Sequence, residues 1–568
     1  MAIRLTLTDC DSIPGKDKLK PRMAANLIKE MSAAEVELPD FIPKVSLMIR
    51  AITCSNTKVK HRLLLLRLLQ EPVTNILQAV HARRIGITLP VANEDAKLLG
   101  IVDGLLRDLI CGYNAIIEEA QGSIGFMRAA SKSQFSEACY GSISFQTRRL
   151  MVSYESYRPV RKGIWSQIHL VYRIARKCES ETFPVNIESS ENIYQSSIEH
   201  IYKRAILIGR SDPYHFSFRG VTRLFDSLEK WPEMVRLTHE AVVPKNNSMF
   251  IVDLKSDFPA APYFQDSADV AGDRFLILDT TELIVCLNME LKSVIHSITG
   301  GLKGIHKVQG FERMEILRHI VISWGMHPIR KAEREDLSLD CKIVFGLTNI
   351  FSILHPDLNA DEVDEIDFDS TAEIQMVLGA FQEKFGKSLD RNSFASSWKI
   401  GNESSGGFSL SHTRSSTKEL RVGDILALQK SGEHKWNICI VRWAMEGDDG
   451  QLQAGVFKIG YNAEPISMKP LEAEKEFLRL EYTAALHIPE ASSFSNTNLI
   501  VAQKTVYSPH RTLYMRRSTR DRLVIPTNLV VSSRSVDVFS YRYDVKDHQR
   551  PLSHQDTLRF NSDSKISI

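Results

Sequence analysis

The spacing of apolar residues divides the chain into two halves. From about Pro21 to Val242 apolar residues recur at helical spacing, as in Val59 to Val80, and strand signals are few. From Asn247 onward, short alternating apolar runs replace this pattern, beginning with Met249 to Leu254. We therefore expect a multidomain α+β protein, in which an N-terminal α-helical domain precedes β-rich segments and a helical connector at about 298–324 joins later strands.

The clearest strand signals follow one another in the middle of the chain, separated by turns rich in Gly, Asp and Ser. The runs are Cys341–Gly346, Arg421–Leu428, Trp436–Trp443 and Ala454–Ile459. Short consecutive strands with tight turns favour a small antiparallel barrel. From Ala484 to Tyr543 strands and turns alternate again. This second β unit is expected to share a sheet or barrel with the strands that precede the first barrel.

A polar turn with the sequence Asn402-Glu403-Ser404-Ser405-Gly406-Gly407 stands between two short strand signals. Asn402 and Ser404 can hydrogen-bond a base edge or a backbone amide, and Gly406 and Gly407 allow the main chain to approach a ligand closely. The Asn-x-Ser-x-x-Gly pattern occurs once in the chain. An ordinary hairpin turn is the alternative interpretation.

Two arginines, Arg330 and Arg334, come before the first strand of the expected barrel. Guanidinium is planar and always charged, donates in pairs to phosphate oxygens or to guanine O6 and N7, and stacks on purine rings. The same spacing also occurs at Arg219/Arg223 and at Arg516/Arg520, so the spacing alone is not specific. A solvated charged loop is the alternative, because acidic residues stand close by.

The order of arginine pair, strand, polar turn and further strands resembles the PilZ domain family of bacterial cyclic di-GMP receptors, over about residues 329–468. The resemblance implies a PilZ-like antiparallel six-stranded barrel that binds cyclic di-GMP. It implies that Arg330 and Arg334 grip guanine and phosphates, and that Asn402, Ser404 and Gly407 cradle the other guanine. By the same resemblance, Arg442 is a second-line contact; alternatively, its stem packs along the barrel.

The two halves of this motif are separated by 68 residues, counted from 334 to 402, which is more than the compact barrel of the family needs. We expect an insertion at about 355–390 that contains an acidic loop at Asp361–Asp369 and a helix at Thr371–Gly386. The acidic loop would repel a dianionic ligand, which favours a solvated loop or a partner surface.

The 568 residues carry 71 Lys and Arg against 69 Asp and Glu, so general affinity for nucleic acid polymers is not expected. Eight cysteines without a Cys-x-x-Cys pair fit a reducing cytoplasm. Cys54, Cys286, Cys341 and Cys439 stand in apolar stretches and are expected in cores. The N-terminus lacks the apolar segment of an export signal, and no run is long enough for membrane insertion.

No nucleophile elbow, phosphate-binding loop, dinucleotide motif or metal-binding constellation stands in the sequence, so an enzyme, a metal site and a cofactor are not expected. The basic run Arg516-Arg517-Ser518-Thr519-Arg520 could contact RNA. Its place after the polar turn breaks the family order, and a solvated hairpin edge is favoured instead.

These observations lead to one expected function with an alternative. The chain is expected to be a cytoplasmic cyclic di-GMP receptor that couples ligand binding to a protein partner of its helical domain. The alternative is a scaffold or interaction protein whose degenerate barrel binds no nucleotide. The expected domains are a helical domain (1–245), strands with a helical connector (246–328), the PilZ-like barrel (329–470), an additional β unit (471–545) and a disordered tail (546–568).

Overall fold

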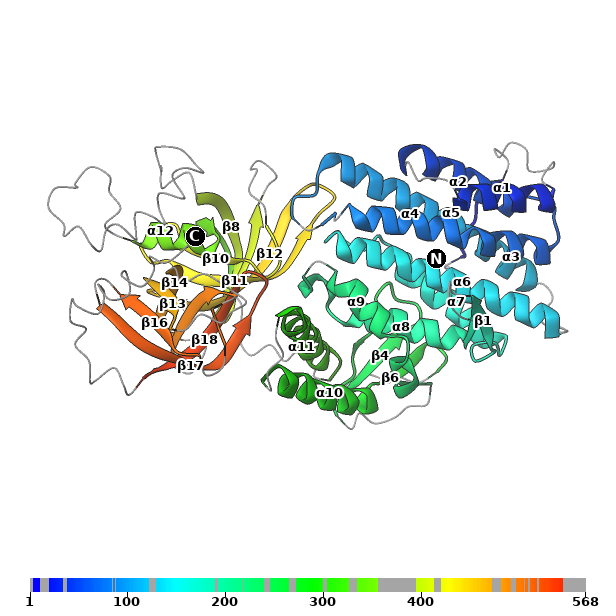
Figure 1. The fold of residues 1–568 in the computed structure, drawn as a ribbon. Coiled ribbons are helices and arrows are strands. Elements are labelled where there is room, and N and C mark those ends of the chain that lie inside the picture. The colour runs from blue at the N-terminus through cyan, green and yellow to red at the C-terminus, as the bar shows by residue number, and fades with distance from the viewer. Residues whose placement is uncertain are drawn as a thin grey trace, which may run out of the picture. The chain divides into compact units, whose positions relative to one another are not determined.

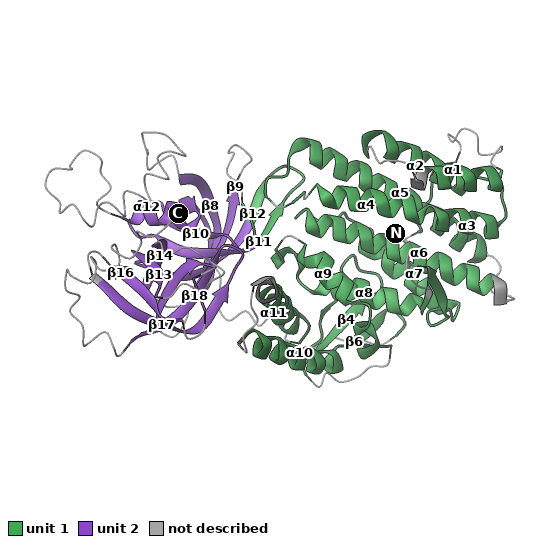
Figure 2. Cartoon of the chain, in the orientation of Figure 1, with its two compact units in different colours: residues 1–331, 413–422, 443–453 green, residues 332–412, 423–442, 454–568 purple. Residues whose placement is uncertain are grey.

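The computed structural model divides the chain into two compact units (Figure 2). Unit 1 comprises residues 1–331, 413–422 and 443–453, and unit 2 comprises residues 332–412, 423–442 and 454–568. The expected acidic insertion and C-terminal tail lie outside the described residues. The structure describes residues 4–10, 20–33, 38–83, 85–86, 88–121, 129–188, 193–217, 219–239, 246–264, 272–299, 304–325, 335–355, 395–412, 420–471, 482–491, 497–504, 506–508, 511–517 and 520–544.

The helices predicted from the apolar spacing form the first part of unit 1 (Figure 1). They are α1 (Pro21–Ala33), α2 (Leu38–Thr53), α3 (Val59–Leu68), α4 (Gln70–Ala82), α5 (Asn93–Gln121), α6 (Ala129–Glu155), α7 (Ile164–Lys177), α8 (Ile198–Arg210) and α9 (Gly220–Ser227). Partly buried polar pairs join neighbouring helices. Arg149 on α6 donates two hydrogen bonds, of 2.7 and 3.0 Å, to the carboxylate of Asp103 on α5. Paired in this way, an arginine can stay partly buried between two helices.

Among its described residues, the rest of unit 1 adds two small sheets, two 3-10 helices and a helix pair. Strands β1 (Val185–Glu188) and β2 (Ile193–Ser196) form a hairpin. A four-stranded sheet has the order β3-β6-β4-β5. Trp324 on α11 is buried, and its indole N–H donates a hydrogen bond to the Leu207 carbonyl on α8 at 3.1 Å. The remaining bounds are η3 (Pro213–His215), η4 (Trp231–Met234), β3 (Arg236–Thr238), β4 (Met249–Asp253), β5 (Ala261–Pro262), β6 (Phe275–Asp279), α10 (Thr281–Thr299) and α11 (Gly304–Gly325).

Most of the predicted antiparallel barrel belongs to unit 2, and the barrel is closed by six strands in the order β10-β11-β12-β9-β8-β7. The barrel closes where β7, its first strand in the chain, pairs with β10, which comes much later in the chain. The fold prediction of a helical half followed by a six-stranded barrel is confirmed. The bounds are β7 (Glu335–Phe345), α12 (Leu347–Leu354), β8 (Ala395–Ser404), β9 (Gly407–His412), β10 (Ile425–Lys430), β11 (Asn437–Glu446) and β12 (Leu452–Tyr461).

A second closed barrel follows in unit 2, with the order β13-β14-β15-β18-β17-β16. The expectation that this β unit shares a sheet with the strands before the first barrel is wrong, because those strands form a separate four-stranded sheet whereas this unit closes into a barrel of its own. One buried apolar cluster joins Val344 of the first barrel, Ile350 of α12 and Leu486 of the second. The bounds are β13 (Glu464–Pro470), β14 (Thr483–Ala491), β15 (Thr497–Gln503), β16 (Leu513–Arg517), β17 (Arg520–Ser532) and β18 (Val536–Tyr543).

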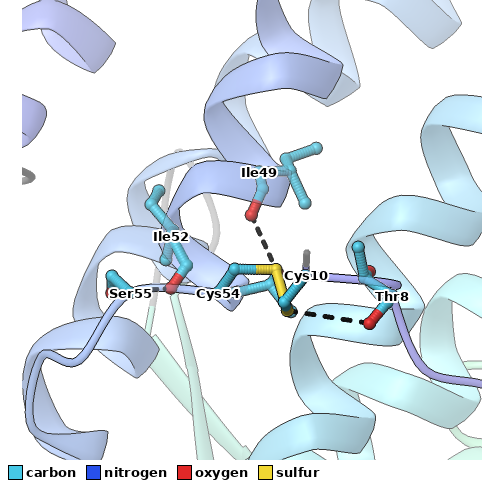
Figure 3. Close-up of a disulfide and its surroundings, with 7 residues drawn as sticks. Thr8, Cys10, Ile49, Ile52, Cys54 and Ser55 are labelled. Atoms are coloured by element: carbon cyan, nitrogen blue, oxygen red, sulfur yellow. Dashed lines mark hydrogen bonds between the residues drawn. A yellow bond between two sulfur atoms is a disulfide. The ribbon is translucent and has the colours of Figure 1, made fainter. Parts of the chain in front are cut away.

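Cys54 is only partly buried, so its predicted place in a core is wrong, and it forms a disulfide with Cys10 (Figure 3). The bond ties the N-terminal segment to the end of α2. Thr6 in the same segment donates its N–H to the Gln167 side chain at 3.1 Å and accepts from Asn114 at 2.9 Å. Disulfides are rare in a reducing cytosol, so this bond does not support the expected cytoplasmic location.

The other cysteines of the sequence prediction remain free thiols. Cys341 and Cys439 are buried, as predicted, whereas Cys286 is only partly buried. Among the helices that the structure describes, none combines the length and the apolar character needed to cross a membrane.

Candidate functional site

The Asn-x-Ser-x-x-Gly sequence forms the hairpin between β8 and β9, with Ser405 and Gly406 as its turn. Glu403 pairs with Phe408, and Ser404 pairs with Gly407. The register shifts between Ile400 and Asn402, which is a β-bulge or irregularity. A bulge re-aims the side chains that follow it.

The bulge decides which side chains point into the barrel. Before it, Trp398 and Ile400 are buried; after it, Glu403 lies on the same side of the hairpin as its buried partner Phe408. Successive side chains of a strand point to opposite faces. Asn402 and Ser404 therefore point away from the barrel interior, where a ligand could reach them.

Glu403 is held by two lysines from neighbouring strands. Its carboxylate lies 2.7 Å from Lys430 Nζ on β10 and 3.3 Å from Lys458 Nζ on β12. Both ammonium groups also lie over the Phe408 ring, at 5.7 and 4.5 Å from its centroid. Burial acts to lower the pKa of Lys430, but the hydrogen bond and charge of Glu403, with a contribution from Glu433, raise it overall. This cluster anchors the end of β8 just where the motif lies.

Gly407 is required by packing within the barrel. A Cβ atom at this position would lie 2.0 Å from the carbonyl oxygen of Val456 on β12. The adjacent Gly406 differs, because a Cβ there would meet no atom within 4 Å. Lys458 donates its backbone N–H to the Gly406 carbonyl at 2.9 Å. The motif glycine at 407 therefore sets how closely β9 approaches β12, and Gly406 leaves open space at the turn.

Asn402 and Ser404 keep hydrogen-bonding capacity for a ligand. The Ser404 hydroxyl has only a long contact of 3.5 Å to the Gly407 carbonyl. No described group hydrogen-bonds the half-buried side-chain amide of Asn402. An amide offers both donors and an acceptor, which suits the edge of a base.

Arg330 and Arg334 lie outside the described residues, so their side chains are not placed. Chain continuity still links them to the hairpin. Strand β7 begins at Glu335, which pairs with Glu403, and Asp336 pairs with Asn402. Arg334 is the residue immediately before Glu335 in the sequence. The arginine pair therefore leads directly into the strand that lines the motif hairpin.

The structure describes the contacts of three other arginines that the sequence analysis considered as ligand or RNA contacts. Arg442 is exposed on β11, with its guanidinium carbon 4.8 Å from the centroid of the Phe457 ring. Arg516 and Arg517 belong to the β16–β17 hairpin and form ion pairs with Asp521 and Glu464. The predicted hairpin is present, but the expectation of a free edge is wrong, because the strands belong to a closed barrel.

Sequence reasoning missed Lys430, Lys458 and Phe408 as the residues that fix Glu403. A signal was available for Lys458, which interrupts the otherwise apolar run Ala454–Ile459. A charged residue within such a run indicates a partner in the barrel. No group of three or more metal-binding side chains occurs within the described part of the chain.

Two protein-family models match the chain. The model described as "Cyclic-di-GMP receptor FimW, N-terminal domain" matches residues 39–242, and that described as "Cyclic-di-GMP receptor FimW, middle PilZ domain" matches residues 355–465. The second match includes β8 to β12 and the motif hairpin, but it begins after β7 and after both motif arginines.

A curated protein, the cyclic-di-GMP receptor FimW of Pseudomonas aeruginosa, is 19% identical over 533 residues, which cover 85% of this chain and 84% of the relative. No solved structure matches the chain. The two family matches agree with the order of a helical unit followed by a barrel. The chain therefore contains a PilZ domain, and the N-terminal domain that precedes it is also of the FimW type.

Proposed function

We propose that this chain is a cyclic di-GMP receptor that binds its ligand at the motif hairpin of the PilZ barrel. The main support is the outward placement of Asn402 and Ser404 on a hairpin whose neighbour, β7, is preceded by the arginine pair. The name of the relative, a cyclic-di-GMP receptor, supports the same ligand.

In this proposal, Arg330 and Arg334 contact the phosphates and stack on one guanine. Asn402 and Ser404 hydrogen-bond the other guanine, and Gly407 keeps the hairpin close to β12 so that these side chains keep their positions. Arginine suits both tasks because its guanidinium pairs with anions and stacks on aromatic rings. Glu403 does not oppose the anionic ligand, because two lysines neutralise it on the opposite face of the hairpin.

We further propose that binding orders the segment with the two arginines and thereby alters the contacts between the helical N-terminal domain and a protein partner. A ligand shifts such an equilibrium only if it interacts differently with the two states, and a basic segment that gains charge-assisted hydrogen bonds meets this condition. The proposed receptor works without catalysis, membrane insertion or binding of nucleic acid polymers. The sequence favours the cytoplasm as its location, whereas the Cys10–Cys54 bond favours an oxidising environment. A scaffold with a barrel that has lost nucleotide binding is the alternative.

Isothermal titration of the full chain with cyclic di-GMP tests this proposal. Saturable binding is expected for the wild type, with large losses of affinity in the Arg330→Ala/Arg334→Ala and Asn402→Ala variants. The control is Arg516→Ala/Arg520→Ala, which removes two arginines of identical spacing from the second barrel. GTP serves as the competitor control.

Equal losses in the motif and control variants would show a general charge effect and reject the assigned site. No binding by folded wild-type protein, confirmed by filter binding, would favour the scaffold alternative. Binding of single-stranded RNA that the Arg516/Arg520 variant loses, with steep salt dependence, would instead favour a nucleic-acid role.

A further inference from the structure

Unit 1 contains a cavity of about 370 Å³ whose lining residues all belong to that unit. Its walls come from α4, α5, α6 and α9, with Ile85 between α4 and α5. The volume lies within the range of about 300–1,000 Å³ typical of small-molecule sites. The cavity is thus large enough for a small organic ligand.

One face of α6 forms a wall of this cavity. Arg148, Met151, Val152 and Glu155 all line it, and they follow the spacing that brings residues onto one side of a helix. Seven residues of α-helix span about 10 Å, so a cation and a carboxyl stand at opposite ends of an apolar strip. Further apolar lining comes from Leu77, Leu99 and Phe225.

Arg148 is the cation at one end of this strip, and it forms no ion pair with any carboxylate in the described part of the chain. Among the described residues, its hydrogen-bond partner is the Thr74 hydroxyl at 3.5 Å, and its guanidinium lies 5.3 Å from the Phe145 ring centroid. Burial lowers the pKa of Arg148, against the opposing influence of nearby tyrosines. A desolvated cation without a counter-ion is costly, and an anionic ligand would remove that cost.

The opposite end of the strip suits an uncharged group or a hydrogen-bond donor. Glu155 accepts from the Thr222 N–H at 3.2 Å and also from the Thr222 hydroxyl. Burial raises the pKa of Glu155, although the Thr222 hydrogen bonds and the charges of His81 and Arg219 act against it. When ionised, Glu155 would repel a second anionic group, and the exposed carboxylate of Asp226 on the cavity lining adds to that effect.

We propose that this cavity binds a small amphipathic organic acid, with its single carboxylate on Arg148 and its apolar body against Met151 and Val152. The charges select a monoanion over a dianion such as cyclic di-GMP. The site is therefore separate from the nucleotide site in both residues and ligand chemistry. Its test does not depend on whether the barrel binds nucleotide.

Calorimetric titration of the full chain with octanoate tests the proposal. Octan-1-ol provides a similar apolar body without the charge, and acetate provides the charge without the body. The variant Arg148→Met removes the cation but keeps an unbranched apolar side chain. Arg107→Gln is the control, since it removes an exposed arginine that does not line the cavity.

We expect one octanoate per chain, with affinity reduced at least about tenfold in Arg148→Met and unchanged in Arg107→Gln. Octan-1-ol should bind Arg148→Met as well as the wild type. The thermal midpoint of Arg148→Met should equal or exceed that of the wild type, because a half-buried cation with no carboxylate partner among the described residues has been removed. A second variant, Val152→Phe, fills the middle of the cavity and should weaken octanoate and octan-1-ol alike.

Three results would overturn the proposal. One is equal octanoate affinity of Arg148→Met and wild type, which would mean that Arg148 does not hold the carboxylate. Another is acetate affinity equal to that of octanoate, which would leave no role for the apolar strip. The third is an absence of saturable octanoate binding by folded wild-type protein at millimolar concentrations.

Discussion

The two adjacent glycines of the PilZ motif allow a sharp test of how the hairpin is held. Replacement of Gly407 by alanine would place a Cβ atom 2.0 Å from the Val456 carbonyl oxygen, whereas ordinary contact begins at 3.4 Å. The two strands must therefore separate by about 1.4 Å, or the hairpin must tilt by a similar amount. Replacement of Gly406 by alanine meets no atom within 4 Å and requires no displacement.

The expected cost of Gly407→Ala follows from that displacement. A separation of this size would break the 2.9 Å hydrogen bond from Lys458 N–H to the Gly406 carbonyl. Loss of one or two hydrogen bonds at about 1 kcal/mol each, added to the cost of overpacking, gives a destabilisation of about 2–4 kcal/mol. For a unit of roughly 150–250 residues this lowers the thermal midpoint by about 4–16 °C.

Differential scanning calorimetry of both variants provides the measurement, with the unfolding transition of unit 2 followed separately from that of unit 1. We expect a clear decrease for Gly407→Ala and a change within about 2 °C for Gly406→Ala. Cyclic di-GMP titration of the stable Gly406→Ala variant then tests the ligand's approach to the turn. Equal midpoints for the two variants would refute the packing role of Gly407.

Three further perturbations test other parts of the structure. Glu403→Gln leaves two lysines without their shared carboxylate and should destabilise unit 2 by about 1–3 kcal/mol in urea unfolding, whereas an unchanged midpoint would contradict the ion-pair cluster. The pKa of Lys430 is raised above 10.5 in the folded state, so the contribution of its charge to the stability of unit 2 is present at neutral pH and is lost as the pH rises through the folded pKa. In Glu403→Gln, this decrease in stability at alkaline pH should be absent. Reductant should destabilise unit 1 by up to about 4 kcal/mol, because Cys10 and Cys54 close a loop with a sequence separation of 44, and Cys54→Ser should make unit 1 insensitive to reductant. Ser197→Ala removes the N-cap hydrogen bond from His200 N–H at 3.1 Å and should cost about 1 kcal/mol in the same assay, while Ser197→Asp should retain most of it.

The sequence by itself determined the class of each segment and the location of the motif hairpin. Local spacing carries this information, because a helix and a strand bury one face at different periods. It also determined that Asn402, Ser404 and Gly407 stand together at a turn, since they are neighbours in the chain. The matched PilZ family and the six-stranded barrel follow from the same ordered signals.

Tertiary structure decided which distant segments meet. Strand closure, the Cys10–Cys54 bond and the cavity beside Arg148 all join residues that are far apart in the chain. The bulge before Asn402 places the Glu403 side chain on the face of the hairpin that carries Lys430 and Lys458, and no local sequence pattern predicted this. Gly407 likewise must be glycine because a side chain there would clash with the Val456 carbonyl on a later strand. Such contacts depend on strand register and on close packing between elements, which local periodicity does not encode.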